Sequence, residues 1–201
     1  MKTEHNKQHE RIAIVNGLRT PFLKAGTQFK GIDADELGVY PLKEALLRSN
    51  ISPDEVDEVI VGCCGQPAHA ANVGRVIALR AGIPKEVPAI TVHRNCASGM
   101  EAISTGAQRL LLGDADIVAT VGVESMSNYP LLYDQKMKTF FEKLSRAKTL
   151  SQRLSVLATF RVRHLKPVIA LQLGLTDPTC NLIMGNTAEN ISREFKISRE
   201  E

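Results

Sequence analysis

Cys96 is the residue whose neighbours give it the clearest chemical role. It lies in the segment TVHRNCASGMEA, where a strand pattern ends near His93 and a helical pattern begins at about Ala97. The first amide N–H groups of a helix lack intrahelical partners, so together with the helix dipole they favour a thiolate at this point. Such N–H groups can also stabilise an oxyanion, and Gly99 leaves room for a ligand or a neighbouring helix. The segment predicts acyl transfer through a thioester; the alternative is a buried structural cysteine at a helix start.

The other three cysteines have no comparable setting. Cys63 and Cys64 end an apolar strand pattern, VDEVIVGCC, and are interpreted as small core residues, while Cys180 has no supporting motif. The sequence contains no CxxC pair and no Cys–His cluster with zinc spacing, so four free thiols and no metal site are expected. His93 is three residues before Cys96, but strand geometry need not direct its ring at that thiol, so it is not assigned as the base.

Strands and helices alternate in the part of the chain that must position Cys96. The expected strands are 11–16, 56–62, 89–93 and 116–121, and the expected helices are 34–48, 72–81 and 97–112. Asp33 is the expected N-cap of the first helix, Pro41 should kink it or move its start, and Gly82 and Gly113 should end the other two. This alternation predicts a layered α/β fold with a parallel sheet and right-handed crossovers.

The alternation stops at a strongly basic segment, residues 135–166. It contains nine Lys or Arg and one acidic residue, a local charge of +8 that leaves −5 for the rest of the chain. Apolar residues recur there in steps of three and four, which predicts one or two basic amphipathic helices. The alternatives are a solvated helix pair packed on its own domain, or a surface for anionic lipid, a partner protein or a phosphorylated cofactor. Beyond it, a helix is expected at 187–195 and the start of another at 197–200.

The composition narrows the class of protein. The 201 residues carry a net charge of +3, with 43% hydrophobic and 23% charged residues, which is ordinary globular usage. Aromatic residues are only 4% and Trp is absent, which disfavours a base-stacking nucleic-acid surface. The sequence contains no run of about 18 apolar residues, so no membrane-spanning helix is predicted. Residues 1–10 are polar, so a disordered tail is expected in place of a secretory signal, and a bacterial cytoplasm is favoured over a mitochondrion.

Seven segments, in order and spacing, resemble the thiolases. They are RTPFLKAG (19–26), VIVGCCGQ (59–66), NVGRVIALRAGIP (72–84), VHRNCASGMEAI (92–103), GDADIV (113–118), GVESMSNYP (122–130) and MGNTAENIS (184–192). The resemblance covers residues 11–201 and implies the N-terminal half of the layered αβα thiolase fold. The implied division is a domain at 11–130, an inserted loop domain with basic helices at 131–183, and the start of a further helical segment at 184–201.

The resemblance also implies a site and a reaction. Cys96 would take the acyl group of a 3-ketoacyl-CoA as a thioester and pass it to free CoA, or run the steps backwards as a Claisen condensation. Met184 matches an acyl-pocket position, for which the alternative is a core methionine before a helix. Residues 124–127 match a loop near the nucleophile and the dimer interface, and a structural role is expected for them. CoA enters as a substrate, with no separate cofactor.

The basic segment most resembles the thiolase β-subunit of the fatty-acid oxidation complex. This implies a homodimer or tetramer, a hydratase–dehydrogenase partner subunit and peripheral membrane contact through 135–166. In thiolases the activating His, a second Cys and an Asn-bearing loop lie in a C-terminal half with no counterpart here, so the 201-residue chain is expected to be inactive alone. The alternatives are another condensing enzyme of the same fold, such as a ketoacyl synthase, and a non-catalytic acyl-CoA- or partner-binding fragment.

Overall fold

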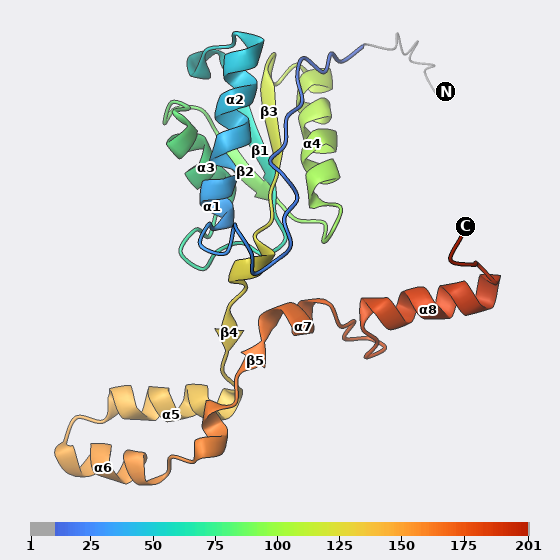
Figure 1. Cartoon of the computed structure of the whole chain (residues 1–201). Coiled ribbons are helices and arrows are strands. Elements are labelled where there is room, and N and C mark those ends of the chain that lie inside the picture. The colour runs from blue at the N-terminus through green and yellow to red at the C-terminus, as the bar shows by residue number, and fades with distance from the viewer. Residues whose placement is uncertain (1–10, 201) are drawn as a thin grey trace, which may run out of the picture. The chain divides into compact units, whose positions relative to one another are not determined.

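The computed structural model describes residues 11–200, so the expected disordered tail at 1–10 lies outside the described residues. The chain divides into two compact units, Met1–Asn128 and Tyr129–Glu201, which are described separately (Figure 1). The second unit includes both the segment 131–183 and the segment 184–201. Within the described part of the chain, no helix combines the length and apolarity needed to cross a membrane.

The first unit is built on a three-stranded parallel sheet. Its strands are β1 (Glu58–Gly62), β2 (Ala89–Val92) and β3 (Val118–Gly122), in the order β2-β1-β3. The register pairs Gly62 of β1 with Val92 of β2 on one side and with Gly122 of β3 on the other. The carboxyl ends of all three strands therefore meet at one edge, and the loops that follow them start side by side.

Helices cover the two faces of this sheet (Figure 1). One face carries α1 (Ala34–Leu37), α2 (Val39–Ser49) and α3 (Val73–Ala81), and the other carries α4 (Ser98–Leu112). All five residues of β1 are buried, as expected for a central strand covered on both faces. The predicted layered α/β fold is confirmed.

The helix stops and caps follow the sequence signals closely. Asn72 accepts a hydrogen bond from the amide of Arg75 (3.2 Å) at the start of α3, and Gly82 ends this helix in the left-handed region, at φ 96°. Gly113 ends α4 in the same way, at φ 73°. Glycine adopts these angles without the steric cost that a Cβ would add.

The expected single helix at 34–48 is two helices, separated at Gly38. Proline has no N–H with which to bond the carbonyl of Leu37, four residues earlier. Starting α2 at Val39 puts Pro41 in the first turn, where backbone N–H groups have no intrahelical acceptor anyway. Pro41 thus moves a helix start, one of the two outcomes expected for it. Asp33 does occupy the N-cap position of α1, but its side chain makes no capping hydrogen bond.

The expected strand at 11–16 is wrong. Ile14 is 86% exposed, and in the described chain no strand pairs with this segment. A hydrogen bond from Asn16 Nδ2 to Ser49 Oγ (3.2 Å) connects it to α2. A β-branched sequence is stabilised as a strand only by ladder hydrogen bonds and cross-strand contacts, and RIAIVN has neither here.

The second unit contains the predicted pair of basic helices, α5 (Gln135–Arg146) and α6 (Leu150–Ala158). Asp134 caps α5 by accepting from the amide of Met137 (2.9 Å), and Thr149 with Gln152 forms a capping box at α6. Its other elements are β4 (Leu131–Leu132), antiparallel to β5 (Val168–Ile169), then α7 (Ala170–Gly174) and α8 (Met184–Phe195).

The last helix begins three residues earlier than expected, at Met184. The helix expected to start at 197–200 is not formed in these residues. Lys196 ends α8 in the left-handed region, and four residues close at most one helical turn, which is the unfavourable nucleation step of a helix. Three short 3₁₀ helices complete the described chain: Pro53–Glu55, Met126–Asn128 and Val162–Leu165.

Candidate active site

Cys96 is exposed in the tight turn between β2 and α4, two residues before the helix begins. Asn95, directly before it, has the left-handed backbone angle φ 46°. Asparagine tolerates this region better than most residues with a side chain. The strand, turn and helix therefore present the thiol at the carboxyl edge of the sheet, as the sequence predicts. Its role as nucleophile remains a prediction.

The turn is closed by Ser98, which sequence reasoning missed. Its side-chain oxygen accepts from the amide of Arg94 (2.9 Å) and donates to the carbonyl of Asn95 (2.6 Å), and the residue is only 4% exposed. The amides of Ala97 and Ser98 donate to Arg94 O (2.9 Å) and Asn95 O (3.1 Å). Those two N–H groups therefore hold the turn and are not free for an oxyanion. Ser98 is the first residue of α4 and not its N-cap, so the capping preference of serine gives no signal for this role.

Glycines let the beginning of α4 approach the sheet backbone. A Cβ on Gly62 would overlap the carbonyl of Ser98, and one on Gly122 would lie 3.1 Å from the Cα of Gly99. A Cβ on Gly99 would lie 3.6 Å from the Cα of Gly122. The contact at Gly99 is an ordinary van der Waals distance, so the expected approach of a ligand or a neighbouring helix there stays a prediction.

The interpretation of Cys63 and Cys64 as a pair of core residues is only half right. Cys63 is fully buried, and burial, followed by the nearby charges of Glu124 and Cys64, raises the pKa of its thiol to about 12. Cys64 is half-buried, and its Sγ lies 3.5 Å from Nε2 of His93. Both residues follow the last residue of β1, Gly62, and the burial of this strand continues through Cys63 but ends at Cys64. His93 thus contacts Cys64, and among the described residues no histidine is hydrogen-bonded to Cys96.

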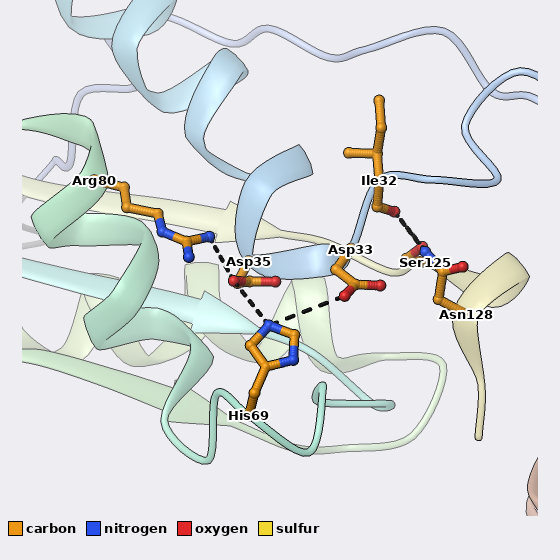
Figure 2. Close-up of polar contacts among 7 residues, drawn as sticks. All are labelled: Ile32, Asp33, Asp35, His69, Arg80, Ser125 and Asn128. Carbon is orange, nitrogen blue, oxygen red and sulfur yellow. Dashed lines mark hydrogen bonds and ion pairs between the residues drawn. The ribbon is translucent and has the colours of Figure 1, made fainter.

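The loop at 124–127 makes the structural contacts expected of it, and these reach across the unit. Glu124 accepts from the amides of Cys64 (2.9 Å) and Gly65 (2.8 Å). Ser125 Oγ donates to the carbonyl of Ile32 (2.7 Å), which also accepts from Asn128 Nδ2 (3.0 Å), as Figure 2 shows. These bonds join the loop after β3 to the loop after β1 and to the residue before Asp33.

Asp33, Asp35, His69 and Arg80 converge beside this loop (Figure 2). Asp35 is almost fully buried, and its Oδ2 lies 2.5 Å from Nη1 of Arg80 and 3.2 Å from Nε2 of His69. The two carboxylates and the imidazole are residue types that can bind a cation, and sequence reasoning did not group them. Arg80 already supplies a positive charge to the buried carboxylate, so we assign the group as an ion-pair cluster that joins α1 to α3.

Met184, the predicted acyl-pocket residue, is the first residue of α8 in the second unit and is 45% exposed. Its amide donates to the carbonyl of Leu175 (3.0 Å). Cys96 and Met184 therefore belong to different units, and a shared pocket remains a prediction.

The family model described as "Thiolase, N-terminal domain" matches residues 12–201. Curated relatives include the mitochondrial trifunctional enzyme subunit beta of Bos taurus, 36% identical over 200 residues, which cover 100% of this chain and 42% of the relative. A 3-ketoacyl-CoA thiolase of Photorhabdus laumondii is 35% identical over 199 residues, which cover 99% of this chain and 45% of the relative. The chain thus spans less than half the length of these relatives.

Solved structures agree with the sequence comparison. The Acat5 thiolase of Ascaris suum in complex with coenzyme A has a TM-score of 0.74 at 29% identity, covering 91% of this chain and 42% of that one. The acetyl-CoA acetyltransferase of Bacillus anthracis has a TM-score of 0.71 at 35% identity, covering 88% and 40%.

Proposed function

Because the chain belongs to the thiolase family, we propose that it supplies the acyl-accepting cysteine, Cys96, of a 3-ketoacyl-CoA thiolase. The observation that carries this proposal is the exposed thiol in the strand–turn–helix at the carboxyl edge of the sheet. Relatives named 3-ketoacyl-CoA thiolase, and solved relatives in complex with coenzyme A, support the substrate class. The pathway is fatty-acid β-oxidation.

The chemistry splits one difficult cleavage into two thioester exchanges. The sulfur of Cys96 attacks the 3-keto carbon, the bond between C2 and C3 breaks, and its electron pair leaves with acetyl-CoA, which takes up a proton at C2. The acyl group stays on Cys96 as a thioester. The thiol of free CoA then attacks this thioester, releases Cys96 and yields an acyl-CoA shortened by two carbons. The reverse sequence is a Claisen condensation.

The described residues place no proton acceptor on Cys96. His69 contacts Asp35, and His93 contacts Cys64. General acid–base catalysis contributes about 10²–10⁴-fold in rate. We therefore expect the 201-residue chain alone to take up an acyl group without sustained thiolysis.

The turnover test follows release of acetyl-CoA from acetoacetyl-CoA and CoA by the purified chain. The proposal predicts no more than about one acetyl-CoA released per chain by the first half-reaction. Multiple turnovers that Cys96→Ser abolishes would contradict the expectation that this chain alone has no proton acceptor for Cys96. Multiple turnovers that survive Cys96→Ser would contradict the assignment of the nucleophile.

A partner subunit is part of the proposal. One relative is named as the beta subunit of a trifunctional enzyme. We propose a hydratase–dehydrogenase subunit as the partner and a homodimer or tetramer of the thiolase subunit. A bacterial cytoplasmic location stays a prediction, because the relatives include both bacterial thiolases and a mitochondrial subunit.

Peripheral contact with anionic lipid through residues 135–166 is supported by the surface of the two basic helices. Leu150, Leu154 and Leu157 lie on one face of α6 and are all about half exposed or more. A hollow of about 300 Å³ beside α5 is lined by Lys136, Lys143 and His164, with four further residues. Exposed apolar side chains and several cations on one pair of helices are typical of helices that bind at a lipid surface.

The membrane test is co-sedimentation with vesicles of phosphatidylserine and phosphatidylcholine. Lys136→Glu with Lys143→Glu should weaken binding, because each basic residue near an anionic surface contributes about 1 kcal/mol. Lys30→Glu with Lys43→Glu makes the same change in charge on the first unit and should have less effect. Equal effects of the two pairs would contradict a site on the basic helices.

A further inference from the structure

Cys64 and His93 form a thiol–imidazole contact that the proposed chemistry at Cys96 does not use. Cys64 Sγ lies 3.5 Å from His93 Nε2. The two residues follow the carboxyl ends of β1 and β2, adjacent strands whose register pairs Gly62 with Val92. Ligands of open parallel sheets bind outside this edge, and the turn bearing Cys96 begins two residues after His93.

The other ring nitrogen of His93 sets the direction of this contact. The amide of Asn95 donates to Nδ1 at 3.5 Å, the outer limit of a hydrogen bond. In the neutral tautomer that suits this bond, the single N–H of the imidazole is on Nε2 and faces the sulfur. A cysteine and an imidazole within hydrogen-bond reach are the arrangement that activates a nucleophilic sulfur.

The surroundings leave this sulfur accessible. Cys64 is half-buried and His93 is exposed, so a reagent can reach the pair from solvent. The nearby carboxylate of Glu124 accepts from the amides of Cys64 and Gly65, which holds the loop in place, and, after burial, its charge raises the pKa of the neighbouring Cys63. Cys63, one residue earlier, is buried in the core and serves as an internal example of a thiol without access.

We propose that Cys64, with His93 as its hydrogen-bond donor, is a second acyl-accepting thiol at this edge of the sheet, with acyl-CoA thioesters as its substrates. The substrate class rests on the proposed function, which brings acyl-CoA to the same edge. The sulfur of Cys64 attacks the thioester carbonyl carbon, a new C–S bond forms, and the bond to the CoA sulfur breaks. CoA leaves as a thiolate that takes up a proton, so the exchange needs no oxidant.

The first experiment measures the reactivity of each thiol without any acyl donor. The chain is treated with iodoacetamide at pH 7, and alkylation of each cysteine is followed over time by peptide mapping. Cys180 is the matched control, because it is exposed and its sulfur makes no hydrogen bond within residues 11–200. Activation of the sulfur by His93 is only partly offset by lower nucleophilicity, so Cys64 should react about threefold faster than Cys180.

His93→Asn separates the two contacts of the ring. An asparagine oxygen at position 93 can still accept from the amide of Asn95 two residues on, so the turn is retained. Its shorter side chain does not reach Cys64, and the rate at Cys64 should fall to that of Cys180. An unchanged rate at Cys64, or a wild-type rate no faster than that of Cys180, would overturn the proposal.

The second experiment supplies acetyl-CoA and maps acetyl groups. In the Cys96→Ser chain, acetylation at Cys64 that decreases when His93→Asn is added supports the proposal. Acetyl on Cys96 of the unmodified chain with none on Cys64 in either chain overturns it and leaves the proposed function standing. Acetyl on Cys64 alone supports it and contradicts the role of Cys96. Acetyl on neither thiol overturns both.

Discussion

At the scale of single residues, the position of Cys96 depends on a buried hydroxyl. Ser98 bridges the amide of Arg94 and the carbonyl of Asn95, the two residues that precede the thiol. Asn95 is held in a left-handed conformation between these bonds. Cys96 itself is exposed, so its orientation is set by the turn that carries it.

Ser98→Ala should therefore loosen the turn. Loss of the hydroxyl leaves the amide of Arg94 and the carbonyl of Asn95 without their partner, which costs about 1–3 kcal/mol in unfolding free energy. The rate at which iodoacetamide alkylates Cys96 should change in this variant, and the urea concentration at the unfolding midpoint should fall. Ser104→Ala, an exposed serine on the same helix, should shift stability by less than about 0.5 kcal/mol. Equal effects of the two substitutions would show that the Ser98 bridge does not hold the turn.

At the scale of elements, the glycines between α4 and the sheet were the hardest feature to anticipate. Strand and helix ranges follow from hydrophobic period and caps, which are local signals. Close approach of Ser98 to Gly62, and of Gly99 to Gly122, joins residues far apart in the chain. The prediction of a strand at 11–16 was wrong for the same reason. Strand formation depends on a neighbouring strand, which the local sequence does not specify.

Gly62→Ala should force α4 away from β1. The new Cβ would overlap the carbonyl of Ser98, which is backbone and cannot rotate aside. Overpacking of this kind costs about 1–3 kcal/mol and here should reach the upper end. Gly17→Ala adds a Cβ that meets no heavy atom within 4 Å and is the matched control. The unfolding midpoints of the two variants in urea are compared. Equal midpoints would contradict the close approach of α4 to β1 at Gly62.

The ion pair between Arg80 and Asp35 should also contribute to stability, because Asp35 is almost fully buried. Arg80→Met keeps the aliphatic stem and removes the charge opposite a buried carboxylate. Breaking a buried pair costs about 3–5 kcal/mol, and since Arg80 is half exposed we expect about 2 kcal/mol. Arg48→Met removes an exposed pair with Glu44 on α2 and should cost less than about 0.5 kcal/mol. A loss at Arg80 as small as the loss at Arg48 would contradict this role.

At the scale of the whole molecule, two units carry the two predicted site residues. Cys96 was identifiable because a strand ending, a cysteine and a helix start are adjacent in sequence. The contact between Cys64 and His93 was not, because it depends on which strands are neighbours in the sheet. The predicted link between Cys96 and Met184 spans both units and rests on family resemblance alone.

Stability of the whole chain should depend on Asp57 in acid. Its Oδ2 accepts from the amides of Asp116 (2.8 Å) and Ile117 (2.9 Å), and these bonds hold its pKa below the ordinary 3.8. A lowered folded pKa contributes stability above the unfolded value, and that contribution is lost as pH falls through the folded value. Asp57→Asn should therefore flatten the decrease in unfolding free energy below about pH 4. A slope unchanged from wild type would show that these bonds do not couple to folding.

Whether Cys96 accepts an acyl group can be measured by site-resolved mass spectrometry of the folded chain after incubation with acetoacetyl-CoA. Circular dichroism of the same sample establishes that the protein is folded. We expect one acetyl group on the peptide containing Cys96, formed faster than any adduct on Cys64 and absent from that peptide in Cys96→Ser. A folded chain with no acyl group on Cys96 would contradict its role as the nucleophile.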